Sequence, residues 1–140
     1  MKKIILLLGV LMLVNGCTSS KTITVQEFYG EDFLEVCSKH KDEIPVKMSY
    51  RESYKVYDDI TDRELIKKVL DTIMSIKVGE KSNISIEDAD RNYYFEYADG
   101  SKIGFMMIKV DNDELIYSFS DKCNYVIEDD NGLFNIKIGE

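Results

Sequence analysis

The stretch from Asn92 to Val110 reads NYYFEYADGSKIGFMMIKV. Two runs rich in aromatic and branched residues flank the dipeptide Asp99-Gly100, and Asp-Gly supplies the positive φ angles of a tight hairpin turn. Such residues are enriched in strands because they pack well on a pleated, half-buried surface. The sequence therefore predicts a β-hairpin with strands over Asn92–Ala98 and Ser101–Val110.

The register of this hairpin follows from the length of its loop. With a two-residue loop, we expect Phe95 opposite Gly104 and Tyr94 opposite Phe105. A glycine leaves room for the ring of a cross-strand neighbour, so Phe95 and Gly104 form a plausible packing pair.

Further strands are predicted on both sides of the hairpin. Upstream, apolar and polar residues alternate from Val46 to Tyr50, a pattern that Tyr54 and Val56 would continue as a half-buried strand. Downstream, clusters of Asp, Asn and Gly mark turns. Between these turns the predicted strands are Leu115–Phe119, Cys123–Glu128 and Leu133–Ile138.

One helix is well defined by its start signal and its periodicity. Thr61-Asp62-Arg63-Glu64 has the spacing of a capping box, in which Thr61 caps the Glu64 amide and Glu64 reaches back. Gly79 is typical of the end of a helical region. One apolar stripe follows the box: Leu65, Ile66, Val69, Leu70, Ile73 and Met74. The stripe predicts an amphipathic helix that buries one face.

These elements predict the α+β class. We expect the amphipathic helix to pack on an antiparallel β-meander, and loosely helical spacing over Glu27–Lys41 adds a short N-terminal helix. The chain divides into a signal segment (1–16), a tether (17–25) and a single globular domain (26–140).

The first residues have the features of a secretory signal. Met1-Lys2-Lys3 is a short basic head, and an apolar run from Ile4 to Val14 follows. This run is shorter than the roughly 20 residues that a membrane-spanning helix needs. The sequence predicts a segment that is cleaved after export.

Leu13-Val14-Asn15-Gly16-Cys17 resembles the lipobox of bacterial lipoproteins, although Asn15 departs from the usual pattern. The resemblance covers the signal region alone. It implies that Cys17 becomes the mature N-terminus and carries a diacylglycerol thioether. Two acyl chains anchor a protein stably, so we expect lipid anchoring at the extracytoplasmic face of a cell membrane. The alternative is an ordinary signal peptide with an incidental cysteine.

The charge excludes one class of partner. Without residues 1–16, which hold Lys2 and Lys3 and no acidic residue, the net charge changes from −8 to −10. A strongly negative field repels phosphate backbones, so we expect no nucleic-acid binding. Membrane attachment then depends on the lipid and not on the domain surface.

Two cysteines remain in the domain if Cys17 carries lipid. Cys37 and Cys123 form an even pair in an exported chain, so a disulfide between them is one prediction. Two separate thiols that pack as small apolar residues are the other. Neither cysteine lies in a CxxC motif, which disfavours a thiol oxidoreductase.

No combination of residues indicates catalysis, a metal or a cofactor. His40, the only histidine, stands between Lys39 and Lys41, and these charges indicate an exposed loop. Carboxylates are abundant, but they cluster at predicted turns, where Asp caps local backbone. None follows the spacing of a calcium loop. We therefore expect no enzyme, no bound metal and no cofactor.

The remaining feature is an excess of tyrosine in the predicted strands. One reading is that these tyrosines form the core and its rim. The other is an amphipathic binding face, for which the candidates are Tyr50, Tyr54, Tyr93, Tyr94 and Tyr97. On this second reading we expect a membrane-tethered, non-catalytic module that binds a protein of the cell envelope. A small-ligand or glycan-binding lipoprotein is the alternative.

Overall fold

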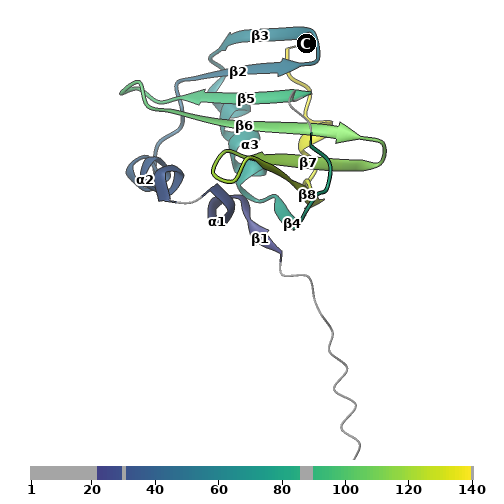
Figure 1. The fold of residues 1–140 in the computed structure, drawn as a ribbon. Helices are drawn as coiled ribbons and strands as arrows, with labels where there is room; N and C mark the ends of the chain where they lie inside the picture. Colours follow the sequence, from purple (N-terminus) through teal and green to yellow (C-terminus); the bar gives the residue numbers. More distant parts are fainter. Residues whose placement is uncertain (1–21, 30, 86–89, 140) are drawn as a thin grey trace, which may run out of the picture.

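A computed structural model describes residues 22–29, 31–85 and 90–139 (Figure 1). The α+β class is confirmed: the described chain is mostly antiparallel sheet with few helices. The strands are β1 (Ile23–Thr24), β2 (Lys47–Glu52), β3 (Lys55–Ile60), β4 (Lys77–Lys81), β5 (Arg91–Glu96), β6 (Lys102–Val110), β7 (Asp113–Ser118) and β8 (Cys123–Asp129). The helices are α1 (Val25–Tyr29), α2 (Glu31–Lys39), α3 (Arg63–Met74) and a short 3₁₀ helix, η1 (Leu133–Asn135).

All described strands belong to one sheet, in the order β1-β4-β8-β7-β6-β5-β2-β3. Strands β5 to β8 follow one another along the chain and across the sheet. The β2–β3 hairpin extends this group beyond β5, and β4 with the short β1 extends it beyond β8 (Figure 1). Strand β3 therefore forms one edge of the sheet.

The β5–β6 hairpin exists, but its loop is longer than predicted. The Tyr97 amide donates to the Ser101 carbonyl at 2.9 Å, so three residues form the loop. Gly100 has φ +85°, and the Asp99 carboxylate accepts from the Ser101 amide at 2.9 Å. A three-residue loop closed by a left-handed glycine is the next most common hairpin loop after the two-residue turn.

The longer loop shifts the register by one residue. Tyr94, not Phe95, lies opposite Gly104, and Phe95 lies opposite Ile103. The predicted pairing of Phe95 with Gly104 was therefore wrong. Because side chains alternate between the two faces of a strand, the aromatic–glycine pair moves to the opposite face of the sheet.

Helix α3 begins and ends elsewhere than its start and stop signals predicted. Asp62 is its N-cap, and the Asp62 carboxylate accepts from the amides of the next turn at 3.0 and 3.2 Å. Asp is a stronger cap than Thr, which explains why Thr61 is not used. The helix ends at Met74, with Ser75 as its C-cap, and Gly79 lies inside strand β4.

A capping box occurs at the first helix instead. The Thr24 amide donates to the Glu27 carboxylate at 2.9 Å, and the Glu27 amide donates back to the Thr24 hydroxyl at 3.4 Å. Thr24 also pairs with β4, and Val25 is fully buried. The last residues of the predicted tether, Ile23 to Val25, are thus packed against the rest of the fold.

Three other predicted elements differ from the structure. Two helices, α1 and α2, occupy the region of the single helix predicted over Glu27–Lys41. The strand at Val46–Tyr50 does not continue straight through Tyr54, because a turn with Ser53 at φ +52° reverses the chain into β3. The predicted strand over Leu133–Ile138 is replaced by η1.

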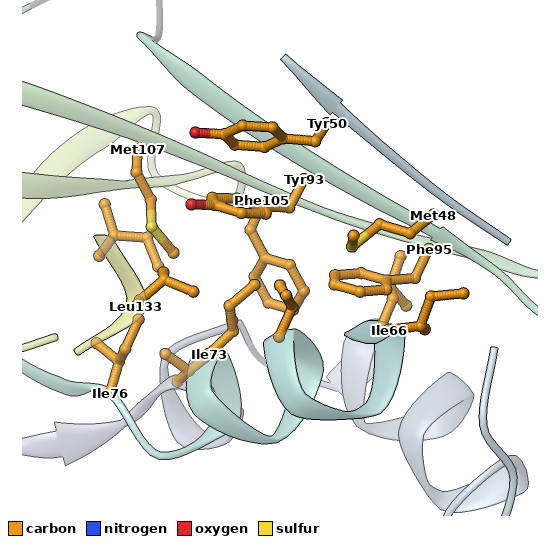
Figure 2. Close-up of a cluster of buried hydrophobic side chains, with 14 of the residues drawn as sticks. Met48, Tyr50, Ile66, Ile73, Ile76, Tyr93, Phe95, Phe105, Met107 and Leu133 are labelled. Atoms are coloured by element: carbon orange, nitrogen blue, oxygen red, sulfur yellow. The ribbon is translucent and has the colours of Figure 1, made fainter. Parts of the chain in front are cut away.

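One apolar core joins the helices to one face of the sheet. Ile66 and Ile73 of α3 point toward Phe95 and Phe105 of the sheet (Figure 2), and all four are fully buried. Burying such side chains stabilises the fold by about 1.5–3 kcal/mol each. The opposite, outer face of β2, β5 and β6 carries Tyr94 and charged residues.

Candidate functional site

The five tyrosines predicted as a binding face are divided between the two faces of the sheet and a turn. Tyr50, Tyr93 and Tyr97 are 7%, 1% and 4% exposed and belong to the core. Tyr54 is 99% exposed at the β2–β3 turn, and Tyr94 is 47% exposed on the outer face. Three of the five are therefore core residues, and only Tyr54 and Tyr94 are available to a partner.

The buried tyrosines form a layer against the sheet. The rings of Tyr50 and Tyr93 lie 4.8 Å apart, one above the other in Figure 2. Burial raises the pKa of Tyr50 to about 12 and that of Tyr93 further, so both remain neutral phenols. These residues pack β2 and β5 against the core.

Tyr94 is held in place on the outer face by Gly104. A methyl group added to Gly104 would lie 2.8–2.9 Å from two carbons of the Tyr94 ring, so the ring rests directly on this glycine. Ser49 lies opposite Tyr94 in the neighbouring strand β2. The ring is thus fixed on one side while nearly half of its surface stays open to solvent.

A row of charged side chains frames Tyr94 on the same face. Lys47 Nζ lies 3.3 Å from Asp59 Oδ1 and 3.5 Å from Glu96 Oε2, and Lys102 Nζ lies 3.5 Å from the same Glu96 atom. Asp59 and Glu96 raise the pKa of Lys47. Exposed ion pairs of this kind add little stability. Their main effect is to place alternating positive and negative charges around Tyr94.

An open hollow of about 320 Å³ lies beside this row. We call the residues that line it the Tyr94 surface: Lys47, Ser49, Asp58, Tyr94, Phe95, Glu96 and Lys102. Sequence reasoning identified Tyr94 but missed the charged residues around it. These charged residues can be found from the sequence only once the hairpin register is known. The alternation of side chains along β2, β5 and β6 then places them on the same face as Tyr94.

A second hollow, of about 340 Å³, is apolar. It lies near the point where the pairing of β6 with β7 stops, at Met107 opposite Ile116. The Tyr29 hydroxyl donates to the Tyr117 carbonyl at 3.1 Å in this gap, and burial raises the pKa of Tyr29. The lining residues are Tyr29, Phe33, Gly104, Phe119 and Ser120.

His40 is buried, contrary to the predicted exposed loop. It is 4% exposed, and its Nδ1 lies 2.9 Å from Glu43 Oε2. On the other side of the ring, Nε2 lies 3.4 Å from Ser101 Oγ and 3.3 Å from Asp99 Oδ2. The charged neighbours of His40 gave no sign of this, because the burial comes from the distant β5–β6 hairpin.

The order Glu43–His40–Ser101 is that of an orienting acid, a base and a hydroxyl nucleophile. Asp99 Oδ2, however, is at least as close to Nε2 as Ser101 Oγ and is itself bonded to Lys39 at 2.6 Å. The nitrogen is therefore shared and not reserved for Ser101. The arrangement links the end of α2 to the β5–β6 loop.

The two domain cysteines are separate free thiols in the structure. Cys37 is half-buried in α2 beside the core, and burial raises its pKa to about 11. Cys123 begins β8, and its Sγ lies 3.3 Å from the Asp121 carbonyl. No disulfide joins the pair in the structure; Cys37 packs against the core, whereas Cys123 contacts a backbone carbonyl.

Cys17, the signal segment and the first residues of the tether lie outside the described residues. Within the described ranges, no helix is both long and apolar enough to cross a membrane. In the same part of the chain, no cluster of three or more His, Cys, Asp or Glu side chains is placed to hold a metal ion.

Comparison with known proteins finds no relative. No protein-family model matches the chain, and neither the curated proteins nor the solved structures contain a match to it.

Proposed function

We propose that the protein is a non-catalytic binding module, tethered by a lipid on Cys17 to the extracytoplasmic face of the membrane, that engages an envelope protein through the Tyr94 surface. The packing of α3 against the β5–β8 meander serves in this proposal as the rigid scaffold. In this proposal the module uses no cofactor, and it binds no nucleic acid, in keeping with the net charge of −10 that remains without residues 1–16.

The observation that carries the proposal is the fixed, half-exposed ring of Tyr94. Tyrosine gives a large amphipathic contact area at a low entropic cost, and it is enriched at interface hot spots. The ring already packs against Gly104 in the free chain, so it has less freedom to lose when a partner binds. The alternating charges of Lys47, Glu96 and Lys102 supply the polar rim that protein interfaces usually have.

The same ring also supports the alternative function. A flat aromatic face with charged donors and acceptors beside an open hollow fits a sugar ring as well as a protein side chain. The two functions differ in the macromolecule that is captured, and a single experiment separates them.

The experiment is cross-linking of the full-length chain in cell envelopes, followed by purification and identification of what is bound. Tyr94→Ala is the test variant, and Phe119→Ala is its control, because Phe119 is similarly exposed (51%) but does not line the hollow beside Tyr94. One stoichiometric protein captured by the wild type and by Phe119→Ala, but not by Tyr94→Ala, supports the proposal. A polysaccharide with this pattern would replace it with the alternative, and capture that is equal in all three chains would refute both.

The tether is tested separately. Wild-type cells fed an alkyne-labelled palmitate should incorporate the label into the protein, and Cys17→Ala should abolish it. An unlabelled wild-type protein would contradict lipid anchoring without affecting the binding surface.

A further inference from the structure

The hollow of the Tyr94 surface lies between an aromatic ring and a carboxylate. Tyr94 of β5 lies opposite Ser49 of β2, and Asp58 lies level with Ser49 at the bulge of the next strand, β3. Neighbouring strands are about 4.8 Å apart, so β5 and β3 are separated by about twice that distance. The small side chain of Ser49 stands between them, and the Tyr94 ring packs on its other side, against Gly104 of β6. The space above Ser49 therefore stays open.

The charges around this hollow do not balance. Two ammonium groups stand against three carboxylates, namely Lys47 and Lys102 against Asp58, Asp59 and Glu96. Both lysines are paired, Lys47 with Asp59 and Glu96, and Lys102 with the same Glu96. Among the residues that the structure describes, Asp58 has no ion-pair partner. The site therefore carries one surplus negative charge, and Asp58 holds it.

An aromatic ring and an unpaired carboxylate on the two sides of one hollow suit a planar cation. A guanidinium is attracted to the face of an aromatic ring, and its fork of donors matches the two oxygens of a carboxylate. It is also more weakly hydrated than an ammonium, so it leaves water more easily. An arginine side chain can use both features at once, whereas the ammonium of lysine is a compact point charge.

The charge of the whole domain favours the same kind of partner. Without residues 1–16 the net charge is −10, and a field of that sign attracts basic partners and repels acidic ones. The hollow of about 320 Å³ is open to solvent and has room for one long side chain. A neutral sugar would leave the charge of Asp58 without a counter-charge, so a basic segment of a protein fits the site better.

We propose that the Tyr94 surface binds an arginine of its protein partner, with the guanidinium against the Tyr94 ring and paired with the Asp58 carboxylate. This inference rests on the binding function proposed above and adds the chemistry that the partner must present. Ser49 forms the floor of the site, below the arginine side chain.

The test is titration of the full-length chain, in micelles of a non-ionic detergent, with the capped peptide acetyl-Gly-Arg-Gly-amide. Amide chemical shifts measured by NMR report where the peptide binds and how tightly. The matched control peptide has citrulline in place of arginine, because citrulline has nearly the same shape and no charge. The arginine peptide should shift the signals of Ser49, Asp58 and Tyr94 saturably, with a Kd in the millimolar range. The citrulline peptide should bind at least about fivefold more weakly.

Variants of the chain separate the ring from the carboxylate. Tyr94→Phe keeps the aromatic face and should preserve arginine binding, whereas Tyr94→Leu should weaken it by about threefold. Asp58→Asn should weaken it by a similar factor. Its control is Asp111→Asn, which makes the same charge change at the exposed turn beyond the far end of β6 and should leave binding unchanged.

Equal binding of the two peptides, or no saturable shift at the Tyr94 surface, would overturn the inference. So would an Asp58→Asn chain that binds the arginine peptide as tightly as Asp111→Asn does. Capture from cell envelopes distinguishes this failure from that of the proposed function. A protein lost with Tyr94→Ala but retained with Asp58→Asn would keep the binding module and refute arginine recognition. Binding of the arginine peptide without any captured protein would support arginine recognition and count against the envelope partner.

Discussion

The imidazole of His40 stacks on the ring of Tyr97, with centroids 4.1 Å apart and planes 11° from parallel. Both residues are almost completely buried. His40 directly follows α2, and Tyr97 directly follows β5. This contact therefore joins the N-terminal helices to the β5–β6 hairpin, which carries Tyr94. The stack and the contacts with Glu43 and Asp99 fix the same corner of the fold.

Replacing His40 with Ala should therefore destabilise the domain. The change removes an aromatic stack worth about 0.5–1.5 kcal/mol and leaves a cavity in place of a side chain that is only 4% exposed. We expect the free energy of unfolding in urea to fall by about 2 kcal/mol. The exposed neighbour Lys41→Ala is the control and should change little. Equal small effects of both variants would show that the stack contributes nothing.

The ion pair between Lys39 and Asp99 should make the stability of the fold depend on pH in the acidic range. Lys39, with the Ser101 hydroxyl and amide, holds the pKa of Asp99 well below its ordinary value of 3.8. A lowered pKa stabilises the folded state above the ordinary value, and this contribution is lost as the pH falls through the folded value. The stability difference between wild type and Asp99→Asn should therefore be largest near neutral pH and shrink below about pH 4.

The control for this measurement is Asp42→Asn, which makes the same charge change on an exposed residue of the loop after α2. Unfolding curves for the three proteins between neutral and strongly acidic pH provide the comparison. A difference for Asp99→Asn that stays constant down to the lowest pH would contradict the ion-pair explanation.

The hairpin illustrates what the sequence could and could not predict. The two strands and their turn followed from Asp99-Gly100, because composition and turn chemistry are local. The register did not, since Asp-Gly also closes a three-residue loop when the Asp99 side chain bonds the Ser101 amide. The shift of the register by one residue decides whether Phe95 or Tyr94 lies opposite Gly104. It therefore also decides which face of the sheet carries the aromatic–glycine pair.

The other differences between prediction and structure arise because tertiary contacts between distant residues override the local sequence pattern. Three of the six residues in the predicted amphipathic stripe are buried, namely Ile66, Val69 and Ile73, and the other three are partly buried and pack against the core. The burial of His40 depends on residues about 60 positions away, which no local pattern reports. Tyr93 and Tyr94 are neighbours in β5 and so point to opposite faces of the sheet, but which of these faces is covered depends on where α3 packs.

The contact between Tyr94 and Gly104 predicts a change of sign in a double-mutant cycle. Gly104→Ala should destabilise the wild type by about 1 kcal/mol, because the new methyl group displaces the Tyr94 ring. With Tyr94→Ala already present, the same change should be neutral or stabilising, since alanine suits a strand better than glycine by about 0.5–1 kcal/mol. Urea unfolding of the four proteins measures the coupling. The same effect in both backgrounds would mean that the ring does not rest on Gly104.

Cys37 should react slowly and with an unusual dependence on pH. Burial raises its pKa to about 11 from an ordinary 9.0, and only the thiolate is nucleophilic. At pH 8 this shift leaves about a hundredfold fewer thiolates than in an unshifted cysteine.

Alkylation of Cys37 with iodoacetamide, in the domain carrying Cys123→Ser, should therefore be slow and should accelerate up to about pH 11. The same protein unfolded in urea is the reference, and equal rates in the two states would show that Cys37 is not protected by the fold. Because the unfolded thiol ionises first, the fold should also lose stability as the pH rises from 9 toward 11.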